Sequence, residues 1–169
     1  MFEVGDYIIY GNNGVCKVDK IGTMDVSGTP KGRLYYTLSP VYAKGSTVFT
    51  PVDNKKVMMR PVISKEEAWK LIDDMNNIDT LWISDERRRE ECYKDALKSC
   101  DAREWIKIIK TLYIRKKSRV AEGKKVTTSD QKYLRMAEDS LFGELAIPLE
   151  MDKSKVEDFI ATRVKKLEV

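Results

Sequence analysis

Residues 4–18, VGDYIIYGNNGVCKV, contain the pattern that decides the fold of the first part of the chain. Runs rich in aliphatic and aromatic residues at 7–10 and 15–21 flank the tetrapeptide GNNG at 11–14. Glycine and asparagine tolerate positive φ angles, so GNNG favours a tight turn. Because apolar and polar residues alternate in the second run, the stretch predicts a β-hairpin.

Strand-like runs continue beyond this hairpin. A turn-forming segment at 27–32 precedes expected strands at 33–38, 46–52 and 56–60. Five short strands in about 60 residues predict a small closed or nearly closed β barrel.

The pattern changes after Pro61, where glycine becomes rare and apolar residues recur at helical spacing. Helices are expected over residues 64–76, 85–98, 101–123, 128–147 and 154–167. The residues expected to cap the first four are Ser64, Ser84, Asp101 and Thr128. The sequence therefore predicts an α+β chain of two domains, a β barrel over residues 1–62 and an all-α bundle of about five helices over 63–169.

The composition argues against an enzyme. The 169 residues include 31 Lys+Arg, 27 Asp+Glu and no histidine, so the commonest general base and metal ligand is absent. The cysteines at positions 16, 92 and 100 fit neither a disulfide framework nor a zinc site, and we expect reduced structural thiols. The adjacent carboxylates Asp73 and Asp74 point in different directions on a helix, so a catalytic pair is not favoured. We expect no cofactor and no bound metal.

The sequence also bears on where the protein acts. The uncharged apolar stretches are too short for a membrane span, and the first residues lack the basic region of a signal peptide. We expect a cytoplasmic protein that is a monomer and has no membrane partner.

Positive charge is concentrated between residues 103 and 125, which carry nine Lys/Arg against two Asp/Glu. Such a helix can face phosphates, and residues Lys117, Lys124 and Lys125 near its end are candidate DNA contacts. A solvated basic face favoured by the helix dipole explains the same pattern. Both interpretations stay open from charge alone.

The three tryptophans have different surroundings. Trp69 and Trp105 lie within or beside apolar helical stripes and are expected to pack in the bundle. Trp82 lies in a polar connection just before the arginine triplet at 87–89. An exposed indole beside guanidinium groups can wedge into a minor groove. The alternatives are that Trp82 fills the junction between helices or domains, and that the arginines pair locally with neighbouring carboxylates.

Several stretches in a fixed order resemble the CarD family of bacterial transcription regulators. They are VGDYIIYGNNGVCKV at 4–18, TVFTPVD at 47–53, YKDALKSCD at 93–101, KTLY at 110–113, RKKSRVAEGKKVTTSDQKYLRMAE at 115–138 and LFGELA at 141–146. The resemblance covers nearly the whole chain. It implies that the first domain is similar to the RNA-polymerase-interacting Tudor-like, or SH3-like, barrel that is also found in the transcription-repair coupling factor.

The resemblance implies a function without catalysis. The barrel would bind the β subunit of RNA polymerase, and the helical domain would touch promoter DNA at the upstream edge of the melted bubble, where the tryptophan of the family wedges into the minor groove and stabilises the open complex. A wedge senses groove shape more than base edges, so the contact would not be sequence-specific. The expected DNA contacts are Trp82, Arg87, Arg88, Arg89, Lys94, Lys117, Lys124 and Lys125, and the expected polymerase contacts are Met24, Arg33, Phe49 and Pro51.

Two features depart from the well-known members of the family. Those members have arginines at the polymerase-contacting positions that correspond here to Met24 and Phe49, and Phe49 can be either an exposed anchor or part of the barrel core. Their wedge tryptophan lies four residues before the tyrosine of the YK motif, where this chain has Arg89. Either Trp82 acts from a shifted loop or Arg89 replaces it. The competing hypothesis is an autonomous nucleic-acid-binding protein that uses the basic helix at 103–125.

Overall fold

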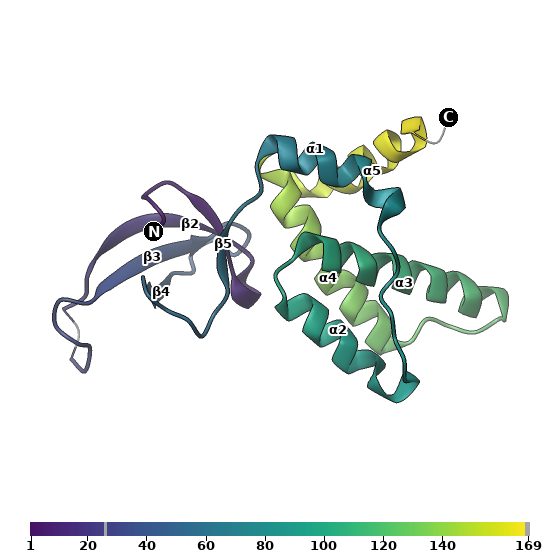
Figure 1. Ribbon diagram of the computed structural model, residues 1–169, viewed down its shortest axis with the longest axis horizontal. Coiled ribbons are helices and arrows are strands. Elements are labelled where there is room, and N and C mark those ends of the chain that lie inside the picture. The colour runs from purple at the N-terminus through teal and green to yellow at the C-terminus, as the bar shows by residue number, and fades with distance from the viewer. Residues whose placement is uncertain (26, 168–169) are drawn as a thin grey trace. The chain divides into compact units, whose positions relative to one another are not determined.

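The computed structural model describes residues 1–25 and 27–167 and has the predicted α+β organisation (Figure 1). The chain forms two compact units, Met1–Val62 and Ile63–Val169. The first consists of strands and the second of helices.

The first unit is a five-stranded antiparallel sheet with the strand order β4-β3-β2-β1-β5. Its strands are β1 (Tyr7–Tyr10), β2 (Val15–Thr23), β3 (Leu34–Pro40), β4 (Val48–Pro51) and β5 (Met59–Pro61). The predicted hairpin is confirmed, because β1 pairs with β2 and the GNNG turn is a single 3₁₀ turn, η1 (Gly11–Asn13). Gly11 has a φ of 44°, and a Cβ atom there would lie 2.7 Å from Cγ1 of Val57.

The sheet curls around one apolar core, which explains the barrel-like pattern of the sequence. The buried centre consists of Ile8, Tyr10, Cys16, Val18, Tyr36 and Leu38. Val48 from β4 and Met59 from β5 both pack against it, although these strands lie at opposite ends of the strand order. The sheet therefore surrounds its core with two edge strands.

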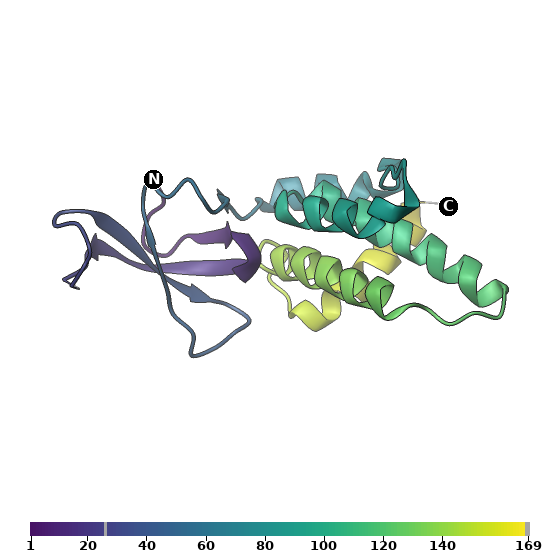
Figure 2. The same cartoon turned by 90° about the horizontal axis from the view of Figure 1, so that it is seen from below.

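The described residues of the second unit form five α-helices. They are α1 (Lys65–Asp73), α2 (Arg89–Lys98), α3 (Ala102–Ala121), α4 (Thr128–Ala146) and α5 (Lys153–Leu167). The long helices α3 and α4 pack along each other, and α2 contacts both (Figure 2). Tyr93, Ala96, Ile108, Leu112, Tyr133 and Ala137 form the buried cluster between them. On the other side of the unit, α5 packs against α1 and α4.

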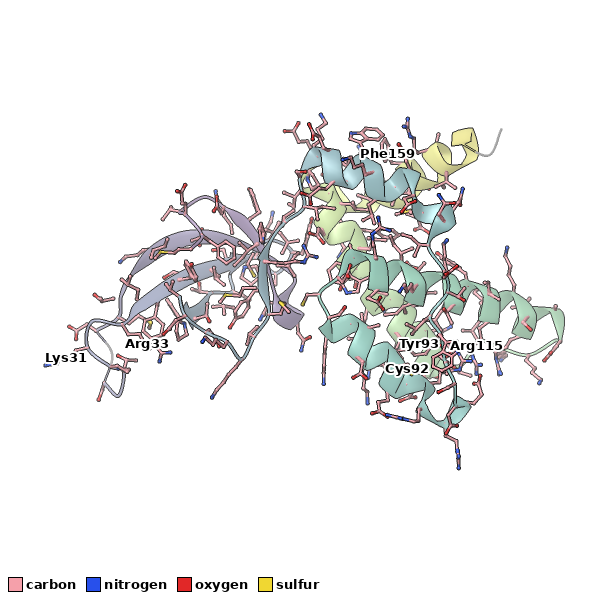
Figure 3. All side chains as sticks on the ribbon, in the orientation of Figure 1. Lys31, Arg33, Cys92, Tyr93, Arg115 and Phe159 are labelled. Atoms are coloured by element: carbon pink, nitrogen blue, oxygen red, sulfur yellow. The ribbon has the colours of Figure 1, made fainter. Side chains whose placement is uncertain are left out.

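The structure confirms the packing roles of two tryptophans. Trp105 is buried. The ring of Trp69 lies 5.5 Å from that of Phe159 on α5, which Figure 3 labels, and the Arg163 guanidinium lies 4.9 Å from the indole centroid.

Several expected boundaries were wrong by a few residues. The helix expected from residue 85 begins as the short 3₁₀ helix η3 (Glu86–Arg88), which Asp85 and not Ser84 caps. Likewise, α4 is capped by Thr127 and not Thr128, since the Thr127 hydroxyl accepts the Asp130 N–H. The expected caps Ser64 and Asp101 are confirmed. Strands β3, β4 and β5 begin one to three residues later than expected, because ladder pairing with their neighbours and not local composition sets their ends.

None of the helices in the described residues combines the length and the apolar character needed to cross a bilayer.

Candidate functional site

The side chain of Trp82 projects into solvent from the helical unit, and the packing of its two neighbours explains this direction. It lies in an extended segment between the 3₁₀ helix η2 (Met75–Asn77) and η3, and 82% of its surface is exposed. Leu81 and Ile83 pack against the cluster between α2, α3 and α4. Successive side chains of an extended segment point in opposite directions, so the inward anchors at 81 and 83 direct residue 82 outward. The alternative that Trp82 fills a junction between helices was wrong.

The three arginines that follow Trp82 differ in their surroundings, although all of them have a carboxylate partner. Arg87 is 89% exposed in its side chain and pairs with Asp85, while Arg88 pairs with Glu91. The Arg89 side chain is only 17% exposed. Its guanidinium donates to Glu86 at 2.6 and 2.8 Å and to the hydroxyl of the buried Tyr93 at 2.7 Å.

These contacts make Arg89 part of the packed structure. The hydrogen bonds to Glu86 raise the pKa of Arg89, while the same guanidinium lowers the pKa of Glu86. Burial raises the pKa of Tyr93. Arg89 is therefore a permanently charged link between η3 and the core, with little side chain left to enter a groove.

Four of the nine Lys/Arg residues between 103 and 125 form ion pairs within the unit. Arg103 pairs with Asp74, Lys107 with Glu104, and Lys124 with Glu122. Arg115 donates to the nearly buried Asp130 at 2.7 Å, and Figure 3 labels Arg115 beside Tyr93. In the described part of the chain, Lys117 and Lys125 are exposed and form no ion pair, and Lys94 on α2 is also exposed.

A groove of about 450 Å³ connects the Trp82 segment to the basic end of α3. It is lined by Thr80, Arg89, Thr111, Ile114, Arg115, Ser118, Arg119 and Glu122. The groove thus brings Arg89, the last arginine of the triplet, next to the last turns of α3, which lie about 30 residues later in the chain. Guanidinium groups of Arg89, Arg115 and Arg119 line this groove, an arrangement that suits a sugar–phosphate backbone.

The second candidate surface is the outer face of β3 and β4. In this antiparallel pair Tyr35 lies opposite Pro51 and Thr37 opposite Phe49, while the inward Tyr36 lies opposite the buried Thr50. Phe49 is 52% exposed, so the alternative that its ring is part of the barrel core was wrong. The alternation of β4 places Thr50 inside, where its hydroxyl accepts from Asn54, and turns Phe49 outward.

The other expected polymerase contacts lie at the same end of the sheet. Arg33 pairs with Asp53 just beyond β4, and its guanidinium lies 5.9 Å from the ring centroid of Tyr35. Met24 directly follows β2, whose last residue Thr23 pairs with Leu34. Since β4 is an edge strand, an aromatic outer face here adjoins an edge on which a partner strand can pair.

The described residues contain no group of three or more His, Cys, Asp or Glu side chains that could hold a metal ion. Cys16 and Cys100 are buried and Cys92 is half-buried, and all three are free thiols. Burial raises the pKa of the Cys16 thiol to about 11, so this thiol is neutral at physiological pH.

A sheet domain with an aromatic edge and a helical domain with an exposed indole define a two-domain protein that binds macromolecules. Comparison with known protein families identifies the family to which this chain belongs. Residues 2–63 match the CarD-like/TRCF RID domain, and residues 70–161 match the C-terminal domain of CarD. The chain belongs to the CarD family, whose proteins are RNA-polymerase-interacting transcription regulators.

The match agrees with the resemblance found in the sequence and limits the class of activity. The CarD family is one of non-catalytic transcription factors, although the first domain type also occurs in the helicase TRCF.

Sequence reasoning missed three polar residues that line the groove, namely Thr80, Thr111 and Ser118. Thr111 and Ser118 follow each other by seven positions on α3, which is the spacing of one helix face. That periodicity was visible, but the residue that faces them, Thr80, comes from a segment with no periodic signal.

Proposed function

We propose that one copy of this protein binds the β subunit of RNA polymerase through the β3–β4 outer face and places Trp82 in the minor groove of promoter DNA at the upstream edge of the melted bubble. The indole occupies an unstacked step and stabilises the open complex. Positive charge for nearby phosphates comes from Arg87, Arg88, Lys94, Lys117, Lys124 and Lys125.

The exposure of Trp82 is the observation that carries this proposal. Indole is among the largest apolar side chains, and burying such a ring in a partner yields a large favourable free energy. Its two neighbours pack against the core, which lowers the cost of ordering the segment on binding. Arg89, the alternative wedge, is committed to Glu86 and Tyr93.

The distribution of charge favours a polymerase-tethered regulator over an autonomous nucleic-acid-binding protein. The ion pairs of Arg103, Lys107 and Arg115 reduce the number of cations on α3 that can replace counterions on bare DNA. Attachment to polymerase raises the effective concentration of the helical unit at the promoter, typically into the millimolar range for short linkages. Two weak contacts then act together at one site.

The polymerase contact on this chain rests on an apolar anchor. Phe49 offers about half of its surface beside Pro51, and Arg33 remains held by Asp53 in the free protein. An exposed aromatic ring flanked by a proline on an edge strand is a typical interface hot spot. This surface suits an apolar pocket of the β subunit, with the arginine at its rim.

The test uses the full chain, the RNA polymerase of the same host and a promoter fragment, and measures the lifetime of open complexes after a competitor is added. Trp82→Ala is expected to shorten the lifetime gained from the protein at least tenfold, because loss of about 1.4 kcal/mol from a wedge contact corresponds to that factor. Trp82→Phe is expected to retain part of the effect.

Met136→Ala, which removes another exposed apolar side chain, serves as the control and should match the wild type. All three variants should bind the isolated β subunit equally well. A Trp82→Ala variant that binds polymerase and still gives the full lifetime would contradict the proposal.

A further inference from the structure

The segment that carries Trp82 is attached to α3 by two hydrogen bonds. The Leu81 N–H donates to Oγ1 of Thr111 at 2.8 Å, and Nζ of Lys110 donates to the Ile78 carbonyl. Figure 1 shows this segment crossing α3 on its way from α1 to α2. Residues 78–85 belong to neither helix nor strand, so these bonds replace the backbone pairing that a regular element would provide.

The Thr111 hydroxyl is used as both donor and acceptor. Its proton goes to the Lys107 carbonyl at 2.7 Å, one turn earlier on α3, and its oxygen accepts the Leu81 N–H. A hydroxyl has a single proton, so Thr111 has none left for a DNA phosphate. The residue lines the groove beside Trp82, yet its hydrogen bonds are made inside the protein.

We infer that Thr111 is a positioning residue that fixes the direction of Trp82 through the Leu81 amide. This inference rests on the proposed function of Trp82 for its effect on promoters, but the positioning itself is a property of the free protein. The Leu81 N–H belongs to the peptide plane between Thr80 and Leu81, so the bond fixes the backbone at the residue that immediately precedes Trp82.

The packing of Leu81 and Ile83 alone does not provide this restraint. Both side chains are only half-buried, and apolar contacts are not directional. The hydrogen bond at Leu81 has a defined direction, and the donation to Lys107 orients the accepting oxygen. Lys110 holds the segment three residues earlier, and burial lowers the pKa of its amine, in agreement with a desolvated contact at Ile78.

The experiment compares three threonine variants of the full chain. Thr111→Val keeps the shape of the side chain and removes both hydrogen bonds, while Thr111→Ser restores the hydroxyl. Thr162→Val is the matched control, because the Thr162 hydroxyl also donates to the carbonyl four residues earlier but lies on α5. Hydrogen exchange of the Leu81 amide is followed by NMR, and the open-complex lifetime is measured in parallel.

In Thr111→Val the Leu81 amide is expected to exchange about fivefold faster, which is the factor that a typical net hydrogen bond represents. The lifetime gained from the protein should fall at least twofold, with unchanged binding to the β subunit. Thr111→Ser and Thr162→Val should match the wild type in both measurements.

The outcomes distinguish the positioning role of Thr111 from the proposed function of Trp82. Unchanged exchange at Leu81 in Thr111→Val would overturn the positioning role, whatever happens at promoters. Faster exchange with an unchanged lifetime would also overturn it, provided that Trp82→Ala abolishes the effect. If Trp82→Ala itself has no effect, the proposed function fails, and faster exchange would still establish that Thr111 orders the segment.

Discussion

Trp82 and Arg89 are predicted to respond in opposite ways to truncation. Trp82 is 82% exposed, so folding removes only about a fifth of its surface from water. A tryptophan side chain has up to about 250 Å² to bury, and about 25 cal/mol is gained per Å². Trp82→Ala therefore costs at most about 1 kcal/mol of unfolding free energy. For a unit of this size the melting temperature falls by no more than about 6 °C.

Arg89→Ala removes the donor to the hydroxyl of Tyr93, a residue that is fully buried. A buried hydroxyl without its partner costs about 1–3 kcal/mol. The pair with Glu86 adds little, because that carboxylate is largely exposed. The helical unit should lose about 2 kcal/mol, which corresponds to a fall of about 10 °C in its melting temperature.

The assay combines thermal unfolding with the open-complex lifetime at 25 °C, where both variants remain folded. Trp82→Ala should melt almost as the wild type does and lose the promoter effect, whereas Arg89→Ala should melt earlier and keep it. Arg87→Ala is the stability control from the same triplet, because its side chain is 89% exposed, and it should leave the melting temperature almost unchanged. A folded Arg89→Ala variant without promoter effect, beside an active Trp82→Ala, would refute the assignment of the wedge.

Three further predictions concern other surfaces. Phe49→Ser should weaken binding to the isolated β subunit at least tenfold in calorimetry while stability changes little, since the ring is half exposed; equal affinity would exclude this face. Lys117→Gln should reduce the slope of log affinity against log salt for promoter DNA by about 0.9, and an unchanged slope would place Lys117 away from phosphates. Because burial raises the pKa of the Cys16 thiol from 9.0 to about 11, its contribution to stability is present below pH 9 and is lost as the pH rises to 11. Urea unfolding of wild type and Cys16→Ala should diverge in that interval.

Much of the fold could be predicted because its signals are local. The GNNG turn needs only a few residues that tolerate unusual φ angles, and the caps Ser64 and Asp101 act within one helical turn. The errors in the predicted helix caps arose where two polar residues are adjacent in the sequence. Asp85 beside Ser84, and Thr127 beside Thr128, offer equivalent side chains, and packing of the following helix decides which one caps it.

The candidate site was predicted less completely, because its residues depend on distant partners. Trp82 and the arginine triplet were recognised as a group, but Arg89 differs from Arg87 only through Tyr93 and the core behind it. Similarly, the lysines and arginines of α3 look alike in sequence. Their partners, such as Asp74 for Arg103 and Asp130 for Arg115, come from other helices.

The sequence by itself determined the class of protein and the two-domain order, and it indicated both proposed contact regions, since composition, periodicity and motif order depend on residues close together in the chain. Only the tertiary structure decided that Trp82 faces solvent, that Phe49 lies on the outer face of the sheet and that Thr111 holds the Leu81 amide. Each of these depends on which side of an element faces the core. That choice is made when segments 30 residues apart pack together, as the bond between Leu81 and Thr111 illustrates.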